Sequence, residues 1–380
     1  MSDAIRHIVV LGAQPEWLSG LRGPLIRDFL ARGYRVTAIG AEEMAGVRAK
    51  LESWGAEYAV VPLRRAGLNP LSDLRAIIAL YRLFRRLKPD LLFAYTVKPI
   101  VYGLPAAWAA RVPRRYAMIA GRGYAFHEGP ERSRRLARIA GTVLLRFAFR
   151  FADGVLFHNN EDVAYFRGNR VLGSATRVRR IWGSGVDLDQ HRPAEMPPLG
   201  PGQPTRFLMI GRLIRDKGVR EYVAAARAVK DEFPDAQFVL VGPTDPSPNG
   251  IGPSEIEAIR SGGAVDYVGP LDDVREAIAQ CHVVVLPSYY EGLPRSVLEG
   301  MAAGRAIITT YAPGCADTVE PGVSGLLVEP RDAEALAAAM RRCIADPAFV
   351  ASAGRRSLEL AREKFDVEQV NSDIADFLGI

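Results

Sequence analysis

Two carboxylates and two cations in this sequence are candidates for a catalytic or binding site. Glu291 and Glu299 lie in the stretch Glu291-Gly-Leu-Pro-Arg-Ser-Val-Leu-Glu299, with seven residues between them. Arg212 and Lys217 lie in a second polar loop, Gly211-Arg-Leu-Ile-Arg-Asp-Lys-Gly218. A forked guanidinium beside a mobile ammonium suits a diphosphate. A carboxylate instead accepts hydrogen bonds from the hydroxyls of a ribose or another sugar. Surface charges on a loop, or an exposed helix residue at Glu299, remain the plain alternatives.

The elements around these residues predict an anion site. The apolar run 283–286 reads as a buried parallel strand, Pro294 fits a first helical position, and Gly304 a helix end. Strand, polar loop and helix N-terminus together are how α/β proteins bind phosphate. The backbone N–H groups around Gly292 and Leu293 are the expected phosphate contacts.

Strands and helices alternate along the whole chain, which predicts an α/β fold with two doubly wound parallel sheets. The expected strands are 7–12, 34–39, 58–63, 91–95, 116–120 and 154–158 in the first half, and 206–211, 237–242, 265–269, 283–286, 306–310 and 325–328 in the second. A segment rich in proline and glycine, 193–204, reads as a linker. The predicted domains are therefore 1–195 and 205–365, followed by a C-terminal helix at 366–380 that packs back on the first domain.

The net charge of +6 divides unevenly. Residues 1–195 hold 31 Lys and Arg against 17 Asp and Glu, whereas the remainder is acidic. Two helices in the first half, 71–87 and 132–151, place arginines beside an apolar stripe. Such helices can lie on anionic membranes, although an ordinary solvated face is the commoner outcome for a single helix. A nucleic-acid binder is a weaker alternative, because no binding module and little aromatic interleaving are present.

Composition excludes other classes. No signal peptide is expected at the start, and no apolar run approaches the roughly 18–20 residues of a membrane span. The three cysteines lack metal-ligand spacing and suit a reducing cytosol. The loop after the first strand, 12–20, is not the Gly-x-Gly-x-x-Gly of a dinucleotide site. The candidates for acceptor binding are Gly20 in this loop, Lys98 after the fourth strand, and Tyr124 and His127 in the loop 121–129.

The spaced glutamates resemble the signature of retaining, nucleotide-sugar-dependent glycosyltransferases of family four, which have the GT-B fold of two Rossmann-like domains facing across a cleft. The stretches 183–187, 211–218 and 322–328 agree with that resemblance. The stretches 67–70, 96–99 and 121–126 are similar to a bacterial branch that acts on undecaprenyl-diphosphate-linked sugars. That branch often transfers N-acetylhexosamines and is N-acetylgalactosaminyltransferase-like.

The resemblance implies roles for the residues. Arg212 and Lys217 would neutralise the donor diphosphate beside Gly211, Glu291 would hold the transferred sugar, and Glu299 the ribose. The base, of a UDP-sugar, would lie near Val268. Many relatives carry a histidine where this chain has Ala120, and His127 is a candidate substitute.

The lead hypothesis is a hexosyltransferase with catalytic Glu291, Arg212 and Lys217, no metal or cofactor, and a polyprenyl-diphosphate-linked acceptor. The protein would be cytoplasmic and peripheral on the inner face of the plasma membrane. It would act in the synthesis of O-antigen or another surface polysaccharide and would have no nucleic-acid partner. A sugar-nucleotide epimerase on the same fold and a non-catalytic nucleotide-sugar-binding module are the alternatives.

Overall fold

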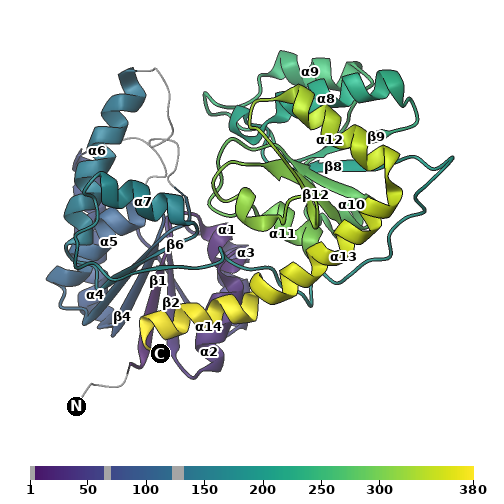
Figure 1. Cartoon of the computed structure of the whole chain (residues 1–380). Helices are drawn as coiled ribbons and strands as arrows, with labels where there is room; N and C mark the ends of the chain where they lie inside the picture. Colours follow the sequence, from purple (N-terminus) through teal and green to yellow (C-terminus); the bar gives the residue numbers. More distant parts are fainter. Residues whose placement is uncertain (1–4, 64–69, 122–131) are drawn as a thin grey trace. The chain divides into compact units, whose positions relative to one another are not determined.

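The computed structural model describes residues 5–63, 70–121 and 132–380 (Figure 1). Contacts divide the chain into a first unit, Met1–Ser184 with Val370–Ile380, and a second unit, Gly185–Gln369. The predicted candidate residues Tyr124 and His127 lie outside the described residues. Two parallel sheets confirm the α/β, GT-B class expected from the alternating pattern.

The described part of the first unit contains a seven-stranded sheet with the strand order β3-β2-β1-β4-β5-β6-β7. Its strands are β1 (His7–Leu11), β2 (Arg35–Gly40), β3 (Glu57–Val60), β4 (Leu91–Tyr95), β5 (Arg114–Ile119), β6 (Gly154–Phe157) and β7 (Val178–Arg180). All neighbouring strands pair in parallel. The central strands are buried throughout, which is why they read as continuous apolar runs.

Helices cover both faces of this sheet. They are α1 (Pro15–Ser19), α2 (Gly23–Ala31), α3 (Ala45–Ser53), α4 (Pro70–Leu87), α5 (Val97–Ala109), α6 (Arg132–Phe149), α7 (Asn160–Gly168) and α14 (Val367–Leu378). One face packs against α4, α5 and α6, and the other against α2, α3 and α14. Figure 1 shows α4, α5 and α6 side by side, and their mutual contacts agree.

The C-terminal helix α14 belongs to the core of the first unit. The Phe377 ring lies 5.8 Å from that of Tyr116, and Arg114 donates to the carbonyl of Gly379 at 3.2 Å. A Cβ on Gly154 would lie 2.7 Å from Phe377, so glycine is needed for this close approach. The helix therefore completes one face of the first sheet.

The second unit contains a six-stranded parallel sheet in the order β10-β9-β8-β11-β12-β13. Its strands are β8 (Arg206–Ile210), β9 (Gln237–Val241), β10 (Asp266–Gly269), β11 (Val283–Leu286), β12 (Ala306–Thr310) and β13 (Gly325–Val328). Its helices are α8 (Val219–Glu232), α9 (Pro253–Ser261), α10 (Arg275–Ala279), α11 (Arg295–Ala302), α12 (Ala333–Ala345) and α13 (Pro347–Lys364), with short 3-10 turns η2 (Arg215–Lys217) and η3 (Ala316–Thr318).

Three details differ from the sequence-based expectations. The division between units falls at Ser184, before the proline-rich segment, which packs onto the second unit: the buried Arg305 donates to the carbonyl of Glu195 at 3.1 Å. Pro294 is the N-cap of α11 rather than its first residue, because its ψ of 111° is extended. The short edge strand β7 was not expected.

Candidate functional site

An ion pair between Lys217 and Glu291 forms the centre of the site in the second unit. Lys217 ends the 3-10 turn after β8, and Glu291 lies in the loop after β11, so neighbouring strands of the sheet bring them together. Ser288 also donates to the Oε1 atom of Glu291, at 2.8 Å. Both charged side chains are mostly buried, with 20% and 13% of their surface exposed. Burial strengthens this pairing and fixes the carboxylate at the carboxyl edge of the sheet.

Two glycines allow the loops around this ion pair to pack against each other. Gly218 has a φ of 74°, and a Cβ there would lie 2.1 Å from the carbonyl oxygen of Pro287. The N–H of Tyr289 donates to the carbonyl of Asp216 at 2.8 Å, which links the same two loops. Gly314, with a φ of 76°, lies under the carbonyls of Glu291 and Gly292. The loops are thereby held as one rigid unit.

Arg212 takes a position different from that of Lys217. Its guanidinium donates to Asp245 at 2.8 Å, and half of its side chain is exposed. Hydrogen bonds from Ser247 and the Arg212 charge together hold the pKa of Asp245 below its usual range. Gly211 directly precedes Arg212, and a Cβ placed on it would lie 3.8 Å from the Lys217 side chain. Both cations therefore lie on the loop after β8, but each is already paired with a carboxylate.

Glu299 is held by groups that the sequence did not single out. It lies in α11 and is 7% exposed. Arg295 donates to it at 2.7 Å from the preceding turn, and the Nε2 atom of His191 lies 3.7 Å away. Burial lowers the pKa of His191, so the ring is neutral at pH 7. The only sequence signal for His191 is its place shortly after the glycine-rich stretch 183–187.

The other expected donor contacts come from two separate strands of the second sheet, the edge strand β10 and the strand β11. Val268, in β10, is 48% exposed. Its neighbour Tyr267 donates to the carbonyl of Gly242 at 3.0 Å, which links the ends of β9 and β10. In the loop before α11, Gly292 is buried and Leu293 is partly buried.

In the first unit, the expected acceptor residues are only partly placed. Gly20 ends α1, where its N–H donates to the carbonyl of Glu16 at 2.8 Å. Lys98 lies in the first turn of α5, with its ammonium 3.9 Å from Asp73 of α4. The residue before that helix, Thr96, has a φ of 68°, a backbone conformation that is rare for a threonine. Gly20 and Lys98 both follow strands of the first sheet.

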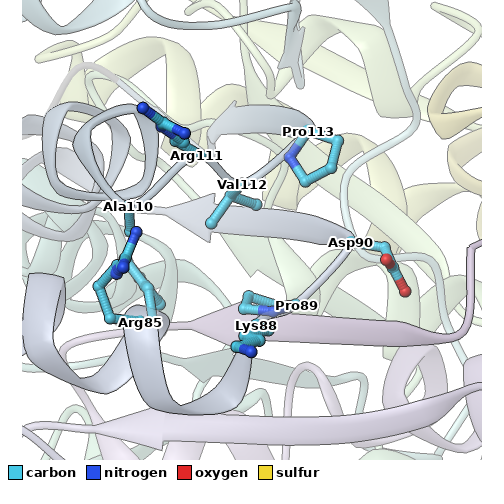
Figure 2. A pocket seen from close by; sticks show the side chains of 9 residues that line it. Arg85, Lys88, Pro89, Asp90, Ala110, Arg111, Val112 and Pro113 are labelled. Carbon is cyan, nitrogen blue, oxygen red and sulfur yellow. The ribbon is translucent and has the colours of Figure 1, made fainter.

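A basic pocket of about 390 Å³ lies at the opposite edge of the first sheet (Figure 2). Arg85, Lys88 and Arg111 line it together with Asp90 and Pro113. Arg85 lies in the last turn of α4, and Lys88 and Arg111 follow the ends of α4 and α5, where positive charge is favourable. Parallel sheets bind ligands at the carboxyl ends of their strands, and this pocket precedes β4 and β5. It is therefore better explained by helix capping than by substrate binding.

No group of His, Cys, Asp and Glu side chains with metal-binding geometry is found in the residues that the structure describes. The three cysteines are buried singly, and burial raises the pKa of each thiol to about 12. They are small core residues rather than nucleophiles. Within the same described part, no helix has the length and apolarity needed to cross a membrane.

The fold and this site define an α/β protein of the GT-B class, with a cation- and carboxylate-lined edge in the second sheet. The family "Glycosyl transferases group 1" matches residues 204–346, and the "Glycosyl transferase 4-like domain" matches residues 23–182. A Campylobacter jejuni protein is 31% identical over 297 residues, which cover 76% of each chain. This chain belongs to the group 1 glycosyltransferases.

The similar proteins have varied activities. The Campylobacter protein is an N,N'-diacetylbacillosaminyl-diphospho-undecaprenol α-1,3-N-acetylgalactosaminyltransferase. A 2-deoxystreptamine glucosyltransferase of Streptomyces kanamyceticus is 26% identical over 88% of this chain and 90% of its own. Among solved structures, Anabaena HepE in complex with UDP superposes with a TM-score of 0.75 at 20% identity, covering 99% of this chain and all of its own. That last likeness shows the fold.

Proposed function

We propose that the protein is a retaining hexosyltransferase that moves a sugar from a UDP-sugar to a polyprenyl-diphosphate-linked sugar. The observation that carries the proposal is the buried pair of Lys217 and Glu291, with Ser288, at the carboxyl edge of the second sheet. A cation for a diphosphate and a carboxylate for sugar hydroxyls lie in contact there. A site that bound only phosphate would have no use for the carboxylate.

The leaving group explains the role of the cations. Negative charge develops on the departing nucleoside diphosphate, and preorganised positive charge lowers the barrier to its departure. Lys217 and Arg212 lie on the same short loop, held by Gly218 against Pro287, so neither needs to reorganise far. Removing one such group typically lowers the rate by about 100- to 1,000-fold.

The two glutamates have separate roles in this proposal. Glu291 accepts hydrogen bonds from the transferred sugar, and Glu299 accepts them from the ribose hydroxyls of the donor. Arg295 donates to the Oε1 atom of Glu299, and the Nε2 atom of His191 lies 3.7 Å from the same oxygen, so the carboxylate already has a cationic partner in the free protein. Because the cations supply the positive charge, the proposed reaction needs no metal ion.

Exposed apolar side chains on the first unit support a membrane-bound acceptor. Leu71, Leu74, Ile78 and Tyr81 of α4, and Ile139, Val143 and Phe147 of α6, are 38–72% exposed. The opposite sides of both helices pack on the sheet through residues such as Leu80 and Leu145, so the two stripes face away from the core.

Exposed arginines flank these stripes, among them Arg75, Arg82, Arg86 and Arg150. Apolar side chains bordered by cations suit an anionic lipid surface, because the cations meet headgroups while the apolar groups enter the interface. The Campylobacter relative, whose name specifies an undecaprenol-linked substrate, supports the same class of acceptor. These observations support the proposal that the protein is peripheral on a membrane, and we propose that it lies on the cytoplasmic face.

The activity test is a screen of nucleotide-sugars against polyprenyl-diphosphate-sugar acceptors, with products read by mass spectrometry. A gain of one sugar by the acceptor supports the proposal. A changed sugar configuration with no gain in acceptor mass would instead identify an epimerase. Nucleotide-sugar binding without any turnover across the screen would identify a binding module.

The membrane test is sedimentation with vesicles containing anionic lipid. Replacing Val143 and Phe147 by serine should weaken binding, and the matched control Val323→Ser changes a valine of the second unit that is 53% exposed. Equal binding of the two variants would remove the membrane argument without touching the donor site.

A further inference from the structure

Three polar side chains of the first unit are buried without a hydrogen-bond partner, and the site described above does not use them. They are Arg22, Tyr95 and His158, which are 1%, 0% and 4% exposed. The Nε and Nη2 atoms of Arg22, the hydroxyl of Tyr95 and both ring nitrogens of His158 are closed off from solvent and unpaired. Buried polar groups are nearly always paired, so we expect these atoms to bind a group that is not part of the chain, either a ligand or ordered water.

The three residues meet at the carboxyl edge of the first sheet. Tyr95 ends β4, His158 follows β6, and Arg22 directly precedes α2. The Arg22 guanidinium carbon lies 5.2 Å from the centre of the Tyr95 ring. Tyr95 and Leu156 belong to the same core face, so His158, two residues after Leu156, projects to that face as well.

Neighbouring backbone leaves room for these side chains. A Cβ on Gly12, at the end of β1, would lie 2.2 Å from the Tyr95 hydroxyl, so only glycine fits there. Ile119 pairs with Phe157, which places Ala120 level with His158 on the adjacent strand. Ala120 is the position where the family resemblance leads one to expect a histidine. His158 therefore brings an imidazole to the same row of strand ends from the next strand.

Donors outnumber acceptors in this cluster. Arg22 has donors only, the phenol of Tyr95 donates once, and a neutral imidazole donates once and accepts once. Burial together with the Arg22 charge lowers the pKa of His158 to about 3, so its ring is neutral. Burial lowers the pKa of Arg22 to about 10, and it remains a cation at pH 7. The N-terminus of α2, which has no side-chain cap, adds a partial positive charge.

We infer that Arg22, Tyr95 and His158 form a second phosphoryl-binding site, in the first unit and separate from the Lys217 site. An oxyanion matches a surplus of donors around one buried cation. The inference rests on the proposed function in one respect, the choice of a phosphoryl group as the oxyanion. That group would come either from the diphosphate of a lipid-linked acceptor or from the diphosphate of the nucleotide donor.

The binding test uses the full chain with Arg212 and Lys217 both replaced by alanine, so that the second unit no longer dominates diphosphate binding. Inorganic pyrophosphate, geranyl diphosphate and UDP are the probes, and melting temperature and calorimetric affinity are the readouts. Adding Arg22→Met should weaken binding of the preferred probe about tenfold or more, the loss expected for a charged hydrogen bond. Geranyl diphosphate as the preferred probe assigns the site to the acceptor, and UDP assigns it to the donor.

Arg32→Met is the matched control, because Arg32 follows the same helix and pairs with Asp28 at the surface. Without a ligand, Arg22→Met should melt at or above the temperature of its parent, since an unpaired buried charge does not stabilise a fold. Tyr95→Phe removes one donor without changing the charge and serves where Arg22→Met does not fold. Affinity within twofold of the parent in the folded variants, or no binding of any probe by the parent, overturns the inference.

Kinetics separate this inference from the proposed function. In an active enzyme, Arg22→Met should raise the KM for the substrate that uses the site more than it lowers kcat. An enzyme that transfers sugar with both KM values unchanged in Arg22→Met contradicts the second site alone. A chain that binds geranyl diphosphate through Arg22 but transfers no sugar contradicts the proposed function alone.

Discussion

The charged side chains at the carboxyl edges of the two sheets differ in whether they are paired. In the second unit, Lys217 pairs with Glu291, Arg212 with Asp245 and Arg295 with Glu299. In the first unit, Arg22 and His158 are buried without a partner. A phosphate entering the second site must compete with carboxylates, whereas one entering the first would meet uncompensated donors.

This difference has consequences for mutation. Removing one member of a buried pair leaves the other uncompensated, so it changes both folding and function. Removing Arg22 takes away a buried charge that contacts the Tyr95 ring but whose Nε and Nη2 atoms have no hydrogen-bond partner, so we expect a smaller loss of stability or none. Five changes test this contrast, in order of decreasing expected effect.

Lys217→Ala should have the largest effect. It removes the cation that touches Glu291, so we expect sugar transfer to fall by about 1,000-fold and the melting temperature to drop, with the protein still folded at the assay temperature. The measurement is the steady-state rate of transfer, with circular dichroism as the check on folding. Arg220→Ala is the control. Arg220 lies at the start of α8, shortly after Lys217, and forms an exposed ion pair with Glu255 of α9, so its removal should leave the rate unchanged. A Lys217→Ala enzyme with near-normal turnover would contradict the role of this site.

Gly314→Ala tests the geometry of the loop that holds Glu291. A Cβ there would lie 2.4 Å from the carbonyl oxygen of Glu291 and 2.5 Å from that of Gly292, and these backbone atoms cannot move aside without moving the carboxylate. We expect transfer to fall by about 100-fold, the usual effect of a misplacement near 1 Å. Gly322→Ala has the same left-handed φ but open space around its Cβ, so it separates backbone strain from the clash. Equal losses in both variants would mean that strain alone is responsible.

His158 should make the stability of the protein depend on pH. Its pKa is about 3 in the fold and about 6.5 when unfolded, so the unfolded chain binds more protons below pH 6.5. Stability is therefore lost as the pH falls. Between pH 7 and pH 5 the wild type should lose about 2 kcal/mol of unfolding free energy more than His158→Gln does. Urea unfolding at both pH values measures this, and parallel losses in the two proteins would show that His158 is not buried as a neutral ring.

Arg212→Lys should lower kcat/KM for the donor by about tenfold. Arg212 is half exposed and uses one nitrogen on Asp245, which leaves the rest of its fork for a phosphate oxygen. A lysine cannot bond both partners with the same planar geometry. Asp245→Asn, which keeps the arginine but removes the competing charge, should not lower donor affinity. A donor kcat/KM that survives the lysine replacement would place Arg212 outside the diphosphate site.

EDTA should have the smallest effect, less than twofold, on the transfer rate. In the proposed mechanism, Lys217 and Arg212 supply the positive charge that a metal gives to other phosphate leaving groups. The measurement compares the rate before and after chelation, and after adding back Mg²⁺ or Mn²⁺. A rate that collapses and then returns with the metal would contradict the metal-independent mechanism.

Most of the fold could be predicted because buried parallel strands appear in the sequence as short runs of apolar residues. Val283–Leu286 shows this directly, since it is buried at every residue. The edge strand Val178–Arg180 was missed because two of its three residues are arginines and its burial is incomplete. The proline-rich segment after residue 193 resembles a linker in composition, but its packing against Arg305 is a long-range contact that composition does not reveal.

The residues of the candidate site also divide into those that the sequence could predict and those that it could not. Glu291 and Lys217 could be found because each follows a strand within a short, patterned loop, and their roles stay predictions. The partners Asp245 and His191 could not, since each comes from a distant part of the chain. Arg22 looks like any basic residue in a loop before a helix. Its burial depends on Tyr95 and His158, which only the order of the strands brings beside it.

The C-terminal helix has a consequence for how the protein is made. The first unit includes Val370–Ile380, and these residues are translated only after the whole of the second unit. Until then the sheet surface that receives Phe377, around Tyr116 and Gly154, stays uncovered. In many chains the first domain is complete before the second is made, whereas here the first unit is completed by residues that follow the second unit. The first sheet therefore gains its cover by α14 only after the second unit has been translated.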